Sequence, residues 1–134
     1  ESDSNTHMLF VDSGTNMLGI NQSTPLSTLD VSGSNSRNIH YETGASLTLG
    51  EHRFVVFNRG SAIAVTMPSI AEGRVYQCSN LGAGAVTFTR ADSDTFYSMS
   101  GTSGTTIDIN QGQMITLIGD ESLNAWHVIR NDMS

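Results

Sequence analysis

The sequence predicts an all-β protein, and three observations support this prediction. No stretch of eleven residues has apolar positions at the 3.6-residue spacing of an amphipathic helix. Short apolar or alternating runs recur instead, many of them about ten residues apart and bounded by Gly, Asn, Asp, Ser or Pro. The chain also has 18 Ser, 14 Thr and 13 Gly, which disfavour helix interiors. These features together favour strands joined by tight turns.

The runs give the expected strands in chain order. Val86-Thr87-Phe88-Thr89 alternates, whereas Met114–Ile118 is more continuously apolar and is expected to be a central strand. Asn80–Gly84 and Gly119–Ser122 resemble hairpin connections. The expected strands are 8–11, 17–20, 29–31, 47–49, 53–57, 62–67, 75–78, 86–89, 106–109, 114–118 and 125–129.

The chain is expected to divide near residue 45, into an extended segment 1–45 and a head domain 46–134. Residues 1–45 have too few large apolar side chains to form a core alone, and 32–38 resemble a loop or hinge. We therefore expect this segment to trimerise as a short intertwined β stem, or else to dock on the head as a β-hairpin. The apolar residues expected to line the trimer are Leu9, Val11, Leu18, Ile20, Leu29 and Val31.

Residues 9–34 resemble a segment common in bacteriophage tail fibres and related trimeric fibre proteins. The similarity rests on LFVDSGTNMLGI at residues 9–20 and STPLSTLDVSGS at residues 23–34. In that family a short strand precedes a turn, a VGIGT-xSP stretch and an xLDVSG stretch. Leu18 replaces the usual Val, and Asn21-Gln22 replaces the usual Gly-Thr. The resemblance implies a trimeric stem.

Residues 46–131 resemble, more weakly, a distal domain found in phage fibres and other virion proteins. The matching elements are VTMP at residues 65–68, GRVYQCSN at 73–80, the VTF and DTF stretches, and a final WHVI at 126–129. This resemblance implies a β-sandwich head, jelly-roll-like, at the tip of a fibre.

Charge excludes several classes of partner. The net charge is −7, and all six basic residues are arginines scattered along the chain, so neither nucleic acid nor an anionic membrane surface is an expected partner. The chain contains no run of 18 apolar residues, so insertion into a membrane is not expected. The four histidines lack the close spacing of a zinc site, and no cofactor motif is present, so no metal or cofactor is expected.

The residues that could carry chemistry favour recognition over catalysis. Asp92 and Asp94 flank Ser93 in a loop, where a turn is favoured over a calcium or sugar contact. Tyr97 is the aromatic residue expected to reach a surface ligand, so Asp92, Asp94 and Tyr97 form the candidate receptor site. Cys78 and Trp126 are expected in the core, and His127 is expected to face away from Trp126. The sequence therefore predicts a protein that is not an enzyme.

The resulting hypothesis is a virion structural protein, extracellular when it acts. It would be the distal part of a phage tail or receptor fibre, a homotrimer that joins other tail proteins and attaches to a host-surface glycan or protein receptor. A purely structural trimerisation or capsid-decoration module is the first alternative. A polysaccharide-degrading enzyme, a cellular adhesin and a monomeric carbohydrate-binding module are the others.

Overall fold

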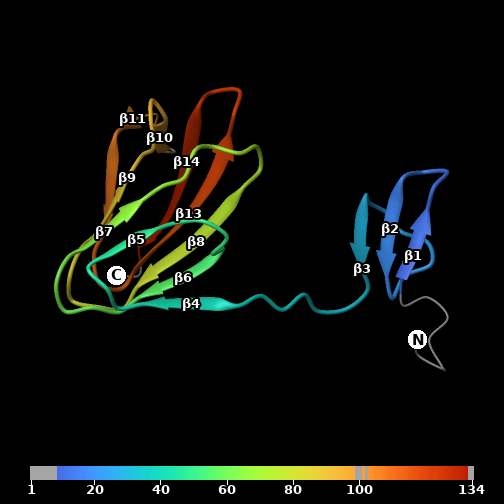
Figure 1. Cartoon of the computed structure of the whole chain (residues 1–134), viewed down its shortest axis with the longest axis horizontal. Coiled ribbons are helices and arrows are strands. Elements are labelled where there is room, and N and C mark those ends of the chain that lie inside the picture. The colour runs from blue at the N-terminus through green and yellow to red at the C-terminus, as the bar shows by residue number, and fades with distance from the viewer. Residues whose placement is uncertain (1–8, 99–100, 102, 133–134) are drawn as a thin grey trace. The chain divides into compact units, whose positions relative to one another are not determined.

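The computed structural model describes residues 9–98, 101 and 103–132, and the regular structure in this part of the chain is entirely β (Figure 1). The all-β class predicted from the sequence is thereby confirmed. The strands are β1 (Leu9–Asp12), β2 (Met17–Ile20), β3 (Leu29–Val31), β4 (Ile39–Glu42), β5 (Ser46–Thr48), β6 (Phe54–Phe57), β7 (Ile63–Thr66), β8 (Val75–Asn80), β9 (Val86–Thr89), β10 (Thr95–Ser98), β11 (Ser103–Gly104), β12 (Thr106–Ile109), β13 (Gln113–Asp120) and β14 (Ala125–Asp132).

The chain forms two compact units, 1–36 and 37–134, here called the stem unit and the head unit. From the sequence, the division was expected near residue 45. The difference is caused by β4, which pairs in parallel with β6 and so belongs to the head unit. In β4 it is the polar residues, His40 and Glu42, that share a face with the buried Val55 and Phe57 of β6.

The stem unit is a three-stranded sheet in the order β1-β2-β3. The β1–β2 hairpin is closed by Asp12, whose Oδ1 accepts hydrogen bonds from Gly14 N (2.9 Å) and Thr15 N (3.3 Å). Asn16 takes the left-handed conformation that ends this turn (φ 57°). β3 then lies parallel to β2. The three strands thus pair within one chain, and no exchange of strands between chains is required to form this sheet.

The head unit consists of a seven-stranded sheet (β11-β10-β14-β13-β8-β6-β4) and a four-stranded sheet (β12-β9-β7-β5). From β4 to β9 the chain alternates between the sheets, so β4, β6 and β8 run parallel in one, and β5, β7 and β9 run parallel in the other. This part is a coil of three turns, each made of one strand from either sheet. A strand of one sheet thus forms the crossover between two parallel neighbouring strands of the other sheet. The expected jelly-roll-like pairing is therefore wrong, because jelly rolls are antiparallel.

The corners of successive turns lie against each other. Leu81 N donates to Phe57 O (2.8 Å), and Gly84 N donates to Arg59 O (3.0 Å). A Cβ on Gly82 would lie 2.2 Å from the backbone N and O of Arg59, so only glycine permits this approach. Residues 80–84 consequently lead from one sheet to the other rather than forming the expected hairpin.

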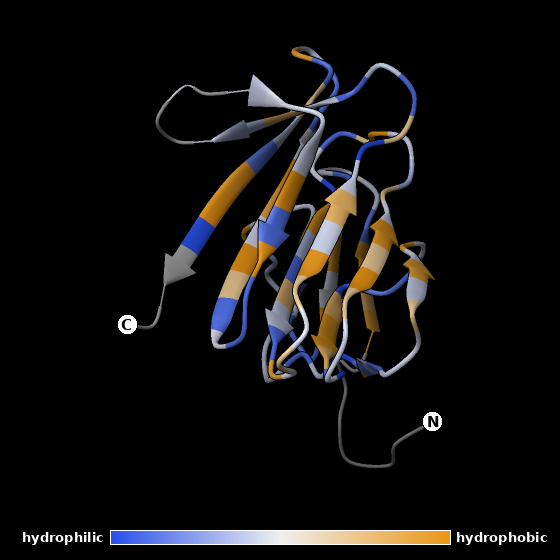
Figure 2. Ribbon diagram, turned by 90° about the vertical axis from the view of Figure 1, so that its left-hand side faces the viewer, coloured by the Kyte–Doolittle hydropathy of each residue, from blue (hydrophilic) through white to orange (hydrophobic). Residues whose placement is uncertain are grey.

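Both sheets contribute their inward residues to one core. Phe57 and Phe88, from opposite sheets, meet edge to face with ring centroids 5.8 Å apart. Trp126 is fully buried beside Tyr76, and Cys78 is buried nearby, as expected. β13 is the middle strand of its sheet, also as expected. Apolar and polar residues alternate along most strands, which is the pattern of a sheet with one buried face (Figure 2).

Candidate functional site

The stem unit presents an apolar face built from the six residues expected to line a trimer. The strand register aligns Leu9, Ile20 and Val31 in one row. It aligns Val11, Leu18 and Leu29 in a second row on the same face. Four of the six remain exposed in this unit: Leu9 by 65%, Val11 by 69%, Ile20 by 38% and Leu29 by 54%.

The opposite face of the stem sheet is covered by its own chain. Gly19 lies so close to the loop after β2 that a Cβ there would be 2.1 Å from Gln22 O. Asp30 Oδ2 accepts a hydrogen bond from Leu26 N (2.9 Å) and holds the same loop. Because the loop covers this side only, none of the described residues of the stem unit covers the six-residue apolar face. We call it the stem face.

The head unit has a second uncovered apolar surface, the outer face of the seven-stranded sheet. All the exposed large apolar side chains on described head strands lie here. They are Ile39 (55%), Tyr41 (65%), Tyr97 (41%), Met114 (40%) and Ile129 (42%). The outer face of the four-stranded sheet differs, since it carries a cross-strand row of four threonines, Thr48-Thr66-Thr89-Thr106.

The residues expected to bind a receptor differ in how far they reach the surface. Asp92 lies in an exposed turn with φ 42°, and its Oδ2 accepts a weak hydrogen bond from Ser69 Oγ (3.4 Å). Asp94 is only 4% exposed, and its Oδ2 has no hydrogen-bond partner among the described residues. The carboxylate of Asp94 is therefore not presented to a receptor as expected, because this residue is buried immediately before β10.

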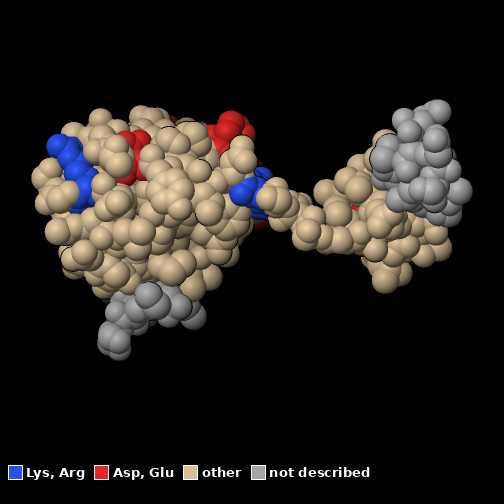
Figure 3. Space-filling view, turned by 90° about the horizontal axis from the view of Figure 1, so that it is seen from below, with Lys and Arg blue, Asp and Glu red and all other residues tan. Residues whose placement is uncertain are grey.

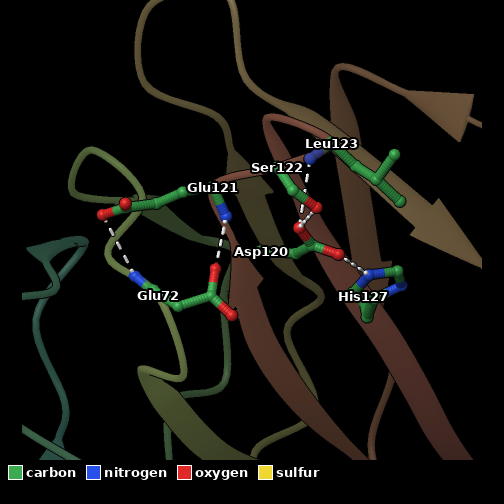
Figure 4. A network of polar contacts seen from close by, with 6 residues as sticks. All are labelled: Glu72, Asp120, Glu121, Ser122, Leu123 and His127. Carbon is green, nitrogen blue, oxygen red and sulfur yellow. Dashed lines mark hydrogen bonds and ion pairs between the residues drawn. The ribbon is translucent and has the colours of Figure 1, made fainter.

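Tyr97 has the expected exposure, and the structure gives it neighbours that the sequence analysis did not assign. β10 and β14 run parallel in a register that pairs Tyr97 with His127. The two rings lie 6.5 Å apart between centroids. His127 Nε2 in turn lies 2.9 Å from Asp120 Oδ2 (Figure 4). Tyr97, His127 and Asp120 thus form a polar and aromatic cluster on the outer face of the seven-stranded sheet.

Hydrogen bonds fix the acid of this cluster. Asp120 Oδ1 accepts from Ser122 Oγ (2.6 Å) and Leu123 N (3.0 Å) in the turn between β13 and β14. The Ser122 hydroxyl first, and then His127 and the Leu123 amide, lower the pKa of Asp120 to about 2. Asp120 is therefore ionised at neutral pH, and it orients the imidazole of His127.

The same turn is tied to the loop before β8. Glu72 N donates to Glu121 Oε1 (3.2 Å), and Glu121 N donates to Glu72 Oε2 (2.9 Å) (Figure 4). Each carboxylate thus accepts from the other residue's backbone. This reciprocal pair joins two loops that are 49 residues apart in sequence, and so stabilises the end of the sheet that carries the cluster.

Neither Ser122 nor Cys78, as the structure describes them, is arranged as an activated nucleophile. Ser122 donates its hydrogen bond to Asp120 and not to His127, so these three residues are not arranged as a Ser-His-Asp triad. Cys78 is buried, and burial raises the pKa of its thiol to about 12, which leaves it protonated and inaccessible. Among the described residues, no group of three His, Cys, Asp or Glu side chains could hold a metal ion.

His127 was singled out from the sequence only as a residue facing away from Trp126, and Asp120 was not singled out at all. The contact depends on the β13–β14 register, which pairs Ile118 with His127 and leaves Asp120 one step further along the same face. The contact between Asp120 and His127 could have been predicted from the sequence only if the length of the turn between the two strands had been known, because that length sets the register.

No protein-family model matches the chain, and no curated protein matches it either. Among the described residues there is no helix long and apolar enough to cross a membrane.

Proposed function

We propose that this chain is the distal part of a phage tail or receptor fibre, which assembles as a homotrimer and attaches the virion to a host surface. The observation that carries the proposal is the stem face. Six apolar side chains from three strands lie on one side of a small sheet, and their own unit leaves most of them in contact with water. Three copies packed by this face would bury side chains that one copy cannot bury.

The mode of trimerisation proposed here differs from an intertwined stem. Because β1, β2 and β3 pair within one chain, the copies would meet through side chains rather than through exchanged strands. The residues at the interface would be the six that the sequence indicated, and the resemblance of residues 9–34 to trimeric fibre stems supports the same assembly.

The head unit would supply the attachment. The face of the head seen in Figure 3 is mostly uncharged, and hydroxyl and amide side chains provide many donors and acceptors for a glycan or protein receptor. Tyr97 provides an exposed aromatic surface beside the oriented imidazole of His127. Three heads on one stem would convert weak single contacts into strong attachment by avidity.

The first test is the molar mass in solution, measured by light scattering after size exclusion. The wild-type chain is expected at three chain masses, with little change on dilution. Val11→Asp would place a charge in the packed stem face and is expected to give one chain mass. Asn16→Asp is the matched control, because it makes the same charge change at an exposed turn of the same unit and is expected to remain trimeric.

The outcomes separate the alternatives. A wild-type mass of one chain contradicts the trimer and leaves a monomeric carbohydrate-binding module as the better hypothesis. A trimer whose fluorescently labelled form attaches to no strain in a panel of bacteria supports a purely structural trimerisation or decoration module. Attachment that is lost in Val11→Asp and kept in Asn16→Asp supports the proposed role of the trimer in adhesion.

A further inference from the structure

A hollow of about 720 Å³ lies in the head unit at the starts of β4 and β6, away from the Tyr97 cluster. Its volume is within the range typical of sites for small ligands. Its walls include Arg37, Asn38, His40, Glu51, His52 and Arg53. In a chain with net charge −7 and only six arginines, two arginines and one acid, Glu51, at one hollow give a local excess of positive charge.

Two arginines line this hollow. β4 and β6 pair in parallel with Ile39 opposite Phe54, so Arg37, two residues before Ile39, and Arg53, one residue before Phe54, lie at the same end of the sheet, and both line the hollow. Among the described residues, neither guanidinium forms an ion pair or a hydrogen bond. Arg37 lies over the Phe54 ring, 6.0 Å from its centroid, an arrangement that leaves its N–H groups available.

The histidines form a second wall. The rings of His40 and His52 are stacked, with centroids 4.1 Å apart and planes 14° apart. Glu42 Oε2, 3.3 Å from Nε2, fixes the orientation of His40. Glu42 is otherwise engaged by the Gly44 amide, which is the main cause of its lowered pKa. This carboxylate therefore holds the histidine pair in place and does not neutralise the arginines.

We propose that this hollow binds a carboxylate-bearing saccharide of the host surface. The carboxylate would be held by the forked N–H groups of Arg37 and Arg53. The sugar hydroxyls would meet the Asn38 amide and the Glu51 carboxylate, and the C–H face of the ring would pack on the stacked imidazoles. The inference rests on the proposed function for its biological meaning, since it names the class of receptor that the head recognises.

The test is a titration of the purified chain, residues 1–134, monitored by amide chemical shifts in NMR. The probes are galacturonate oligomers and N-acetylneuraminic acid, with galactose oligomers and sodium sulfate as controls. Shifts are expected at Asn38, His40, His52 and Arg53 with both acidic sugars and not with the neutral one. Shifts of equal size with sulfate alone would overturn the saccharide and leave a simple anion site.

Three variants test the geometry. Arg53→Gln is expected to raise Kd for the acidic sugars by roughly tenfold or more. Arg53→Lys keeps the charge and loses the forked donor, so its Kd should lie between those of wild type and Arg53→Gln. Arg130→Gln, which removes the same charge from β14, should leave Kd unchanged. Equal Kd values for wild type and Arg53→Gln, with the fold intact by Trp126 fluorescence, would contradict the proposal.

These measurements fail independently of the proposed function. Absence of sugar binding in a chain that forms trimers and attaches to cells would overturn this site and leave the fibre proposal standing. Sugar binding by a chain that is monomeric and does not attach to cells would support this site and contradict the fibre proposal.

Discussion

Asn80 offers the sharpest test of how the coil of the head unit is held together. It is 1% exposed and points inward at the corner between β8 and β9. Its Nδ2 donates to Gly84 O (2.8 Å) and to Ile109 O (3.2 Å), and its Oδ1 accepts from Gly82 N (3.0 Å). One buried amide thus satisfies three backbone groups from two segments of the chain.

The expected cost of Asn80→Ala follows from these contacts. A net hydrogen bond contributes about 0.5–1.5 kcal/mol, and a buried polar group left without a partner costs more. Three such contacts give a loss of about 3 kcal/mol in the free energy of unfolding. For a unit of this size, that corresponds to a fall in Tm of roughly 10–20 °C.

Urea unfolding followed by Trp126 fluorescence measures this loss. Trp126 is the sole tryptophan and is fully buried in the head core, so its signal reports on the head unit. Asn58→Ala is the matched control, because Asn58 lies exposed at the preceding corner and should cost less than about 0.5 kcal/mol. A loss for Asn80→Ala no larger than that of the control would refute the reasoning.

Asn80→Asp adds a test with a defined sign. The carboxylate would keep the bond from Gly82 N but would face the carbonyl oxygens of Gly84 and Ile109. Burial and these oxygens should raise its folded pKa above the unfolded value near 3.9. Relative to wild type, the variant should therefore be most stable below that pH and should lose stability as the pH rises through the folded pKa.

Three further predictions concern other features of the fold. Gly82→Ala forces the backbone to shift and should lower the free energy of unfolding of the head by roughly 2 kcal/mol or more. Gly60→Ala is the control: a Cβ there meets open space, so the free energy of unfolding should change by less than about 0.5 kcal/mol in the same urea assay. Cys78 should react with a thiol reagent at pH 8 only as fast as the head unfolds, because burial raises its thiol pKa to about 12; rapid labelling of the native chain would disprove this. In a carboxyl NMR titration, Asp120 should titrate near 2 and move toward 3.8 in Ser122→Ala, so its contribution to stability is present above the unfolded pKa and fades as the pH falls toward 2.

The sequence determined the strands wherever one face is apolar and the other polar. Val86–Thr89 alternates in sequence, and in β9 the two apolar residues are buried. Two strands could not be predicted in this way: β4, in which the residues alternate but the polar ones face inward, and β10, which lies in a Ser- and Gly-rich segment. In both strands the assignment depends on a parallel partner distant in sequence.

Alternation alone also placed the six stem residues on matching sides of their own strands, since each pair is two residues apart. Only the register of β1, β2 and β3 decided that the three pairs share one face of the sheet. The arginine hollow and the Tyr97–His127–Asp120 cluster depend on pairing between β4 and β6, and between β10, β13 and β14. Local composition determines which side of a strand is apolar, but which strands become neighbours is decided by packing across the whole core, and the candidate sites follow from that choice.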